Sequence, residues 1–187
     1  MPSPFLYFAD DRLSRAELSA ACLDGDLVEL GDAYIPADAV ETTALRAGSL
    51  SGILSETLAA THLTAAWIHG ALPDPPARHT VQRAVSRRRK HIPEYRMIYR
   101  DLAVDPSDLQ RIGGVWVTTP TRTLADLSRV DDEAHARAAL LLAGTGFGLA
   151  DSAMGWLEAH AGLPHRHAGL ARLKRLSDQD DVTRYTS

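Results

Sequence analysis

Gly113-Gly-Val-Trp-Val-Thr-Thr-Pro-Thr-Arg-Thr-Leu-Ala-Asp-Leu127 is the stretch of the sequence that decides the fold. Its first part predicts a short buried strand over residues 115–117, because Val, Trp and Val are β-branched or aromatic and lie between a Gly-Gly pair and a proline. The strand is expected to end near Thr119, since Pro120 cannot donate a hydrogen bond to a sheet. We also expect the side chain of Trp116 to be buried.

The second part of the same stretch predicts a helix. A hydroxyl from Thr119 or Thr121 is placed to accept a hydrogen bond from the free N–H groups of the first helical turn. Apolar residues then recur at helical spacing, at positions 124, 127 and 130. Asp126 follows Arg122 by four residues, so we expect these two side chains to form an ordinary helical ion pair. This joint therefore divides the chain into mixed α/β material before it and helices after it.

The composition of the 187-residue chain is ordinary for a soluble globular protein, with 45% hydrophobic and 24% charged residues. The length fits one domain, or a small module attached to a larger one. Cys22 is the only cysteine, which rules out a disulfide within the chain and favours a reducing compartment. No apolar run is long enough to cross a bilayer, and the N-terminus does not have the pattern of a signal peptide. We therefore expect a cytoplasmic protein.

The net charge of −4 hides an uneven distribution along the chain. Residues 78–100 contain eight Lys or Arg and one acid, Glu94, so this segment carries +7. The other 164 residues hold 12 basic and 23 acidic side chains, which is −11. A concentrated basic segment on an acidic protein indicates a local anionic partner.

Residues 1–37 are expected to form a helix followed by a hairpin. Ser14 predicts a helix start, and Glu17 three residues later completes a capping box. Two short apolar-rich runs, residues 26–30 and 33–35, surround Gly31-Asp32 and predict two strands joined by a turn. This order is typical of the second half of a winged helix-turn-helix, in which the helix enters the major groove of DNA.

Residues 38–187 are expected to form a second unit. Residues 38–60 are helical by period, with an interruption near Gly48 or Gly52. Residues 79–85 and 95–99 alternate and predict strands on either side of the basic run, which would form a sheet with residues 115–117. Helices are expected around residues 133–143, 149–160 and 167–176. The predicted fold class is α+β: a reduced winged-helix-like module, then a small, mainly antiparallel sheet packed with helices, and a helical C-terminus.

Basic side chains are the candidate contacts for DNA or a partner protein. They are Arg12, Arg15, Arg83, Arg87, Arg88, Arg89, Lys90, Arg96 and Arg100. The alternative for Arg12 and Arg15 is a solvated helix start, and for the run from Arg87 a solvated hairpin turn. Tyr95 and Tyr99 can stack on bases, and they fit core packing equally well.

The remaining residues give little support for catalysis or for a metal. His69 and His79 fit structural roles better than ligand roles. The histidines at positions 160, 165 and 167 have no Cys or carboxylate set of metal-site spacing beside them. There is no phosphate loop and no nucleophile elbow. We therefore expect a non-enzymatic protein without a cofactor, a metal or a small-molecule substrate.

In order and spacing, a series of motifs over about residues 12–130 resembles the AbiEi-type family of bacterial antitoxins and transcriptional regulators, especially its actinobacterial members. The motifs are Leu13-Ser-Arg-Ala-Glu-Leu18, Gly25-Asp-Leu-Val-Glu-Leu30, Ala33-Tyr-Ile35, Leu63-Thr-Ala-Ala-Trp-Ile-His-Gly70, His79-Thr-Val81, the run from Arg87 to Lys90, and Val117-Thr-Thr-Pro-Thr-Arg-Thr-Leu-Ala-Asp-Leu127. The resemblance implies an N-terminal winged-helix DNA-binding module and a C-terminal α/β domain for regulation or antitoxin action. In type IV toxin–antitoxin systems such a protein represses its own operon, and its toxin resembles a nucleotidyltransferase.

Two features depart from this family. The segment before Ser14 is short for the leading helix of the DNA-binding module, and the hairpin carries Asp26, Glu29 and Asp32 where the family usually has basic residues. Acidic groups beside phosphates oppose DNA binding. The sequence therefore predicts a regulator or antitoxin that binds DNA, a cognate toxin, or both. Two alternatives stay open: a protein-interaction module that has lost DNA binding, and a degenerate domain related to nucleases or nucleotidyltransferases.

Overall fold

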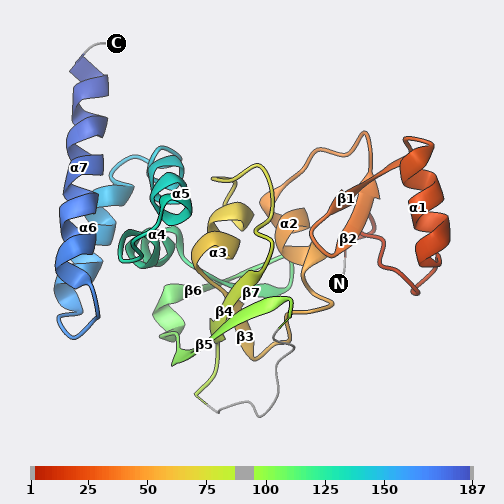
Figure 1. Cartoon of the computed structure of the whole chain (residues 1–187), viewed down its shortest axis with the longest axis horizontal. Coiled ribbons are helices and arrows are strands. Elements are labelled where there is room, and N and C mark those ends of the chain that lie inside the picture. The colour runs from red at the N-terminus through yellow and green to blue at the C-terminus, as the bar shows by residue number, and fades with distance from the viewer. Residues whose placement is uncertain (1–2, 87–94, 186–187) are drawn as a thin grey trace.

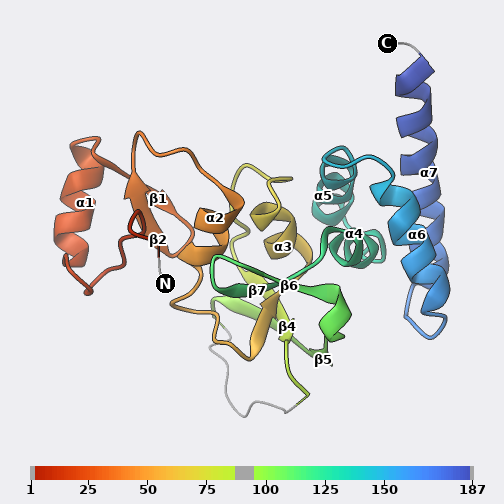
Figure 2. The same cartoon turned by 180° about the vertical axis from the view of Figure 1, so that it is seen from behind.

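The computed structural model describes residues 3–86 and 95–185 and shows a mixed α+β fold with two sheets (Figure 1). The molecule is elongated. The first helix and the hairpin lie at one end, a five-stranded sheet lies in the middle with two short helices, and the last helices form the other end, as the view from behind also shows (Figure 2). Within the described ranges, no helix is both long enough and apolar enough to span a membrane.

The expected helix and hairpin are present at the N-terminal end, as α1 (Arg15–Leu23), β1 (Leu27–Leu30) and β2 (Ala33–Pro36). The capping box is confirmed: Ser14 N donates to Glu17 Oε2 (2.8 Å) and Glu17 N donates to Ser14 Oγ (3.3 Å). A winged helix is not confirmed, because α1 is the only helix before the hairpin in the described residues.

The hairpin is tied to the segment before α1 and to the helix after it. The backbones of Tyr7 and Tyr34 exchange two hydrogen bonds of 2.9 Å, so the N-terminal segment runs beside β2. The turn residue Gly31 has a φ of 59°, and a Cβ there would lie 2.4 Å from Ser49 Oγ. Glycine is therefore required by both the backbone conformation and the close approach of the next helix.

The segment 38–60, expected to be helical, is helical only in α2 (Thr43–Ser49) and ends in the strand β3 (Leu58–Ala60). The interruption falls near Gly48, as expected, since Leu50 is the C-cap of α2. The strand could not be distinguished by period, because a run of three apolar residues fits a buried strand and a buried helix equally well. The short helix α3 (His62–Ile68) follows directly.

The central sheet has the strand order β5-β4-β3-β7-β6. Its other strands are β4 (His79–Arg83), β5 (Met97–Ala103), β6 (Leu109–Ile112) and β7 (Val115–Thr118), with a 3₁₀ turn, η1 (Pro106–Asp108), before β6.

The expectation of a mainly antiparallel, three- or four-stranded sheet is wrong. The β3–β4 and β6–β7 pairs are antiparallel, but the β3–β7 and β4–β5 pairs are parallel. The two strands on either side of the basic run therefore do not form a hairpin. A parallel connection needs about a dozen residues, and the segment between Arg83 and Met97 is long enough to provide it.

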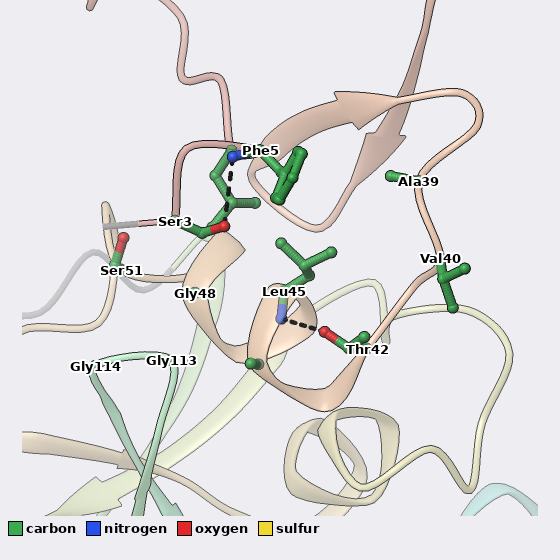
Figure 3. Close-up of a pocket in the computed structure, with 12 residues that line it drawn as sticks. Ser3, Phe5, Ala39, Val40, Thr42, Leu45, Gly48, Ser51, Gly113 and Gly114 are labelled. Atoms are coloured by element: carbon green, nitrogen blue, oxygen red, sulfur yellow. Dashed lines mark hydrogen bonds between the residues drawn. The ribbon is translucent and has the colours of Figure 1, made fainter. Parts of the chain in front are cut away.

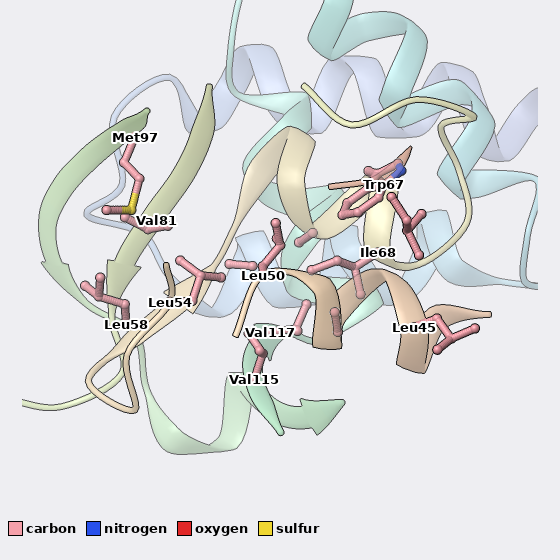
Figure 4. Close-up of a cluster of buried hydrophobic side chains, with 14 of the residues drawn as sticks. Leu45, Leu50, Leu54, Leu58, Trp67, Ile68, Val81, Met97, Val115 and Val117 are labelled. Carbon is pink, nitrogen blue, oxygen red and sulfur yellow. The ribbon is translucent and has the colours of Figure 1, made fainter. Parts of the chain in front are cut away.

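One face of the sheet packs against α2 and α3 and encloses the first hydrophobic core (Figure 4). Trp67 and Ile68 of α3 are fully buried there, beside Val81 and Val117 of the sheet. Leu30 and Ile35 of the hairpin belong to the same cluster, along with other residues of α2 and the sheet.

The expectation that Trp116 is buried is wrong. Its side chain is only partly buried, and the guanidinium of Arg111 lies over its ring at 5.3 Å from the ring centre. Trp116 lies between Val115 and Val117, which are buried, so its side chain points to the other face of the sheet. The pattern of three apolar residues did not reveal which of them faced the core.

The helical C-terminus is confirmed as α4 (Pro120–Ser128), α5 (Glu133–Ala143), α6 (Leu149–Ala159) and α7 (Arg166–Tyr185). Of the two hydroxyls considered as the cap of α4, it is Thr119 that accepts from Arg122 N (3.3 Å). Leu124, Leu127 and Ala66 share a second hydrophobic core with α5, α6 and α7. Because α3 supplies Ala66 to this cluster and Trp67 to the first, it joins the sheet to the helices.

Candidate protein or nucleic-acid interface

A polar cleft of about 420 Å³ lies where the N-terminal end meets the central sheet. Arg15 from the start of α1 lines it, with Glu29 and Asp32 from the hairpin and Tyr95 and Arg96 from just before β5. The fold therefore brings two of the predicted basic residues, Arg15 and Arg96, to one site, although they are distant in sequence. The cleft contains charges of both signs.

Arg96 and Asp32 form an ion pair across this cleft through Nη2 and Oδ1. The hydrogen bond that Arg96 donates to Asp32 raises the pKa of Arg96 above its usual value. The side chains are 39% and 22% exposed, so solvent screens the pair only in part. One of the three hairpin acids is thus neutralised by a residue of the basic segment, while Asp26 and Glu29 are exposed.

The other predicted contact residues lie elsewhere. Arg12 is exposed in the turn before α1. Arg83 is 8% exposed, and its Nε lies 3.0 Å from Asp101 Oδ1, so its charge is held in an ion pair at the end of β4. Arg100 is exposed on β5 and lines a different pocket. Arg87, Arg88, Arg89 and Lys90 lie outside the described residues.

A buried ionic network on α4 was only partly visible in the sequence. The pair of Arg122 and Asp126, expected as an ordinary helical contact, is formed with a 2.9 Å bond from Nε to Oδ2, but Asp126 is fully buried. Arg122 Nη1 also donates to Asp108 Oδ2 of η1 (2.9 Å), and Arg129 Nη2 donates to Asp126 Oδ1 (2.5 Å). Burial opposes the ionisation of Asp126, but its electrostatic interactions with His62 and with these arginines outweigh burial and lower its pKa.

Trp156 of α6 completes this network. Its Nε1 donates to Asp108 Oδ1 (2.8 Å), and the guanidinium of Arg122 lies over its ring at 4.5 Å. The network therefore links the sheet, α4 and α6. Partners so far apart in sequence leave no spacing signal, which is why sequence analysis missed Asp108 and Trp156. This network has a structural role, because each of its carboxylates accepts hydrogen bonds from arginine or tryptophan side chains and does not face solvent.

Three histidines lie in environments that favour the neutral form of the imidazole. Burial lowers the pKa of both His62 and His79 to about 4, and it also lowers the pKa of His69. His69 Nε2 is 2.8 Å from Thr118 O, so it serves a structural contact, as expected. His79 lies against the ring of Trp67, with ring centres 6.4 Å apart.

His62, which sequence analysis did not consider, lines a small pocket with Arg100, Asp126, Arg129 and His165. His62 Nε2 and Arg129 Nε are buried without a hydrogen-bond partner among the described residues. Both atoms are covered by protein, so a ligand in the pocket would not reach them directly. In the part of the chain that the structure describes, no cluster of three or more His, Cys, Asp or Glu side chains could hold a metal ion.

An apolar pocket lies beside α2, away from the polar cleft (Figure 3). Its volume is about 760 Å³. Phe5, Val40 and Leu45 line it, together with Gly113 and Gly114 of the turn between β6 and β7. No residue of this pocket was predicted as a site, because its apolar and glycine residues carry no chemical motif.

Comparison with known proteins gives one family match. Residues 58–145 match the family model of the AbiEi antitoxin C-terminal domain. The match begins at β3 and ends just after α5, so it includes the whole central sheet and the ion pairs of α4 with Asp108, but not Trp156. A search of curated proteins found no match to the chain.

Proposed function

We propose that the chain is an antitoxin-like regulator that acts by binding a protein toxin, because residues 58–145 match the family model of the AbiEi antitoxin C-terminal domain. The distribution of its charged residues supports a protein partner over a nucleic acid. Residues 1–37 contain seven acidic and two basic side chains. A phosphate backbone would meet these acids at the place where a winged helix would need cations.

This proposal rests on the polar cleft, which contains charges of both signs. It presents Arg15 beside Glu29, and its other cation, Arg96, is already paired with Asp32. Charges of both signs within one cleft fit a protein surface, on which acids and bases alternate, and they give specificity through complementary pairing. The hairpin that forms one wall is held in place by Leu30 and Ile35 in the first core, so the cleft is preorganised.

Duplex DNA is the second candidate, supported by a different observation. The ion pair of Arg96 with Asp32 removes one of the acidic charges and joins the hairpin to the segment 78–100, which carries +7. Arg12 and Arg15 are exposed at the start of α1, where a recognition helix would contact phosphates. DNA binding would then depend on the basic segment more than on the hairpin.

If the chain binds a toxin through the cleft, it should restore the growth of cells that express the toxin. A nucleotidyltransferase-like toxin encoded next to this chain is expressed alone and together with it. The wild-type chain should restore growth. Arg15→Glu should abolish most of the rescue, because it reverses the charge of an exposed cleft residue and leaves the core unchanged.

Arg137→Glu is the matched control, since Arg137 is also an exposed helical arginine but lies on α5. It should rescue growth as the wild type does. Full rescue by Arg15→Glu would remove the cleft from the interface. No rescue by the wild-type chain, with both proteins detected in the cell, would reject the antitoxin role for this pair.

A separate prediction tests DNA binding. The wild-type chain should bind a random duplex weakly in a fluorescence anisotropy titration. Glu29→Lys should increase affinity at low salt and steepen the dependence of log K on log salt by about one unit, because one phosphate contact is added. Asp32 is left unchanged, since replacing it would also release Arg96.

Asp151→Lys on α6 is the control for general charge effects, because Asp151 is exposed far from the hairpin. It should leave the salt slope nearer to the wild-type value than Glu29→Lys does. Equal affinities and slopes for the two variants would mean that the hairpin does not lie along a phosphate path.

A further inference from the structure

The apolar pocket beside α2 is enclosed by three segments that are separate in sequence (Figure 3). They are the N-terminal residues 3–6, the stretch that leads into α2 and continues along it, and the turn between β6 and β7. Its volume of about 760 Å³ lies within the range of about 300–1,000 Å³ that is typical of small-molecule sites.

Close backbone packing makes part of the pocket wall. A Cβ on Gly113, which has a φ of 54°, would lie 2.3 Å from Ala44 O. A Cβ on Gly48 would lie 2.8 Å from Leu6 Cδ1. The β6–β7 turn and the N-terminal segment therefore contact α2 directly, and the pocket is formed by fixed packing of these elements.

The chemistry of the lining defines the ligand class. Among the residues that the structure describes, no charged side chain lines the pocket, and the side-chain polar groups that do are the hydroxyls of Ser3, Thr42 and Ser51. Thr42 Oγ1 already accepts from Leu45 N (3.2 Å), and Ser3 Oγ accepts from Phe5 N (3.4 Å). Each hydroxyl keeps its own proton and one lone pair, so it can still donate a hydrogen bond to an acceptor on a ligand. An anion or cation would lose its hydration here without gaining an opposite charge.

We propose that this pocket binds a neutral, largely apolar small molecule that carries one or two hydrogen-bond acceptors. Phe5 and Val40 at the pocket are 54% and 80% exposed, and a ligand of this class would cover such apolar surface. The apolar contacts supply the affinity, and the hydroxyls orient the ligand.

The pocket is also connected to the polar cleft through the N-terminal segment. Leu6 lines the pocket, and its neighbour Tyr7 pairs with Tyr34 of β2 through two backbone bonds of 2.9 Å. Tyr34 in turn lines the cleft that contains Arg15 and Arg96. Contacts of a bound ligand would therefore add to the packing of the N-terminal segment that supports the hairpin. A link between the pocket and the cleft rests on the proposed function, whereas ligand binding itself does not.

The test uses N-phenyl-1-naphthylamine, a neutral apolar fluorophore, with the intact chain. Its fluorescence should rise saturably with a stoichiometry of one. Its sulfonated analogue, 8-anilinonaphthalene-1-sulfonate, has the same aromatic frame with a negative charge and should bind at least tenfold more weakly.

Ala44→Phe should weaken binding of the neutral probe at least tenfold, because Ala44 is exposed, lines the pocket and would fill it when enlarged. Ala134→Phe is the matched control, since Ala134 is also exposed at the second position of a helix but lies on α5. It should bind the probe as the wild type does. Thermal unfolding verifies that both variants fold, and Ser51→Phe at another exposed lining position takes the place of Ala44→Phe if that variant does not.

Saturable binding that is lost in the pocket-filling variant alone supports the site. The absence of saturable binding to the wild type, equal affinities of Ala44→Phe and Ala134→Phe, or stronger binding of the sulfonate would each overturn it. None of these results depends on a toxin, so failure of this site is distinguishable from failure of the antitoxin role.

Discussion

Trp67→Ala should lower the free energy of unfolding by about 3–5 kcal/mol, because it leaves a large cavity in the first core. The Trp67 side chain is fully buried and packs with Leu50 and Ile68 (Figure 4). Its ring also faces Arg46, whose guanidinium lies 5.6 Å from the ring centre. Since domains are stable by about 5–15 kcal/mol, this one substitution would remove a large share of the stability. Urea denaturation followed by circular dichroism measures the change.

Trp116→Ala is the matched control, because Trp116 is a tryptophan on β7 that is only partly buried. It should cost about 1–2 kcal/mol, through partial loss of burial and of the contact with Arg111. Trp67→Phe should cost less than Trp67→Ala, since it keeps a ring and removes Nε1, which has no hydrogen-bond partner among the described residues. Equal losses for Trp67→Ala and Trp116→Ala would contradict the placement of the core.

Local signals were sufficient for the elements whose determinants lie within a few residues. Ser14 and Glu17 predicted the start of α1 because a capping box is closed by contacts three residues apart. The strand and helix joined at Pro120 were predicted for the same reason. The sheet order was not, since strand pairing is decided by contacts between distant segments. The missed strands β3 and β6 are short, and neither shows a clear alternation of apolar and polar residues.

The candidate interface was predictable in composition but not in geometry. Excess positive charge marked the segment 78–100, and the structure places Arg96 of that segment in the cleft with Arg15. The pairing of Arg96 with Asp32 joins residues 64 positions apart, which no helical or strand spacing can indicate. The same limit hid the partners of Arg122, whose bond to Asp126 within one helix was expected while its bond to Asp108 was not.

Acidification from pH 7.5 to pH 5 should lower the free energy of unfolding by about 4 kcal/mol, because two buried histidines must be protonated when the chain unfolds. Burial lowers the pKa of His62 and of His79 to about 4 in the folded chain. In the unfolded chain the pKa of each is about 6.5. Between these values the unfolded state binds protons that the folded state does not bind, so stability is complete above pH 6.5 and is lost as the pH falls toward 4.

Charged groups near these two histidines also affect their protonation. Arg100, Arg129 and His135 oppose protonation of His62, and only Asp126 favours it. For His79, Arg96 opposes protonation and Asp32 favours it. The carboxylates with lowered pKa, such as Asp126, begin to lose their contribution only near and below their usual value of 3.8. The loss of stability between pH 6.5 and 4 therefore comes from the histidines.

Urea denaturation at pH 7.5, 6.5, 5.5 and 5 measures the slope of stability against pH in the wild type and in two variants. His62→Gln and His79→Phe should each reduce that slope by roughly a third to a half, because each removes one of the two groups whose pKa is lowered to about 4, while His69, whose pKa burial also lowers, contributes to the remaining slope. The slope is the quantity to compare, since each variant also changes the stability at neutral pH through packing. His167→Gln is the control, as its side chain is exposed at the start of α7, and its slope should equal that of the wild type. If the slopes of His62→Gln and His79→Phe also equal the wild-type slope, the acid sensitivity does not come from these two histidines, and their neutral, buried state in the folded chain is contradicted.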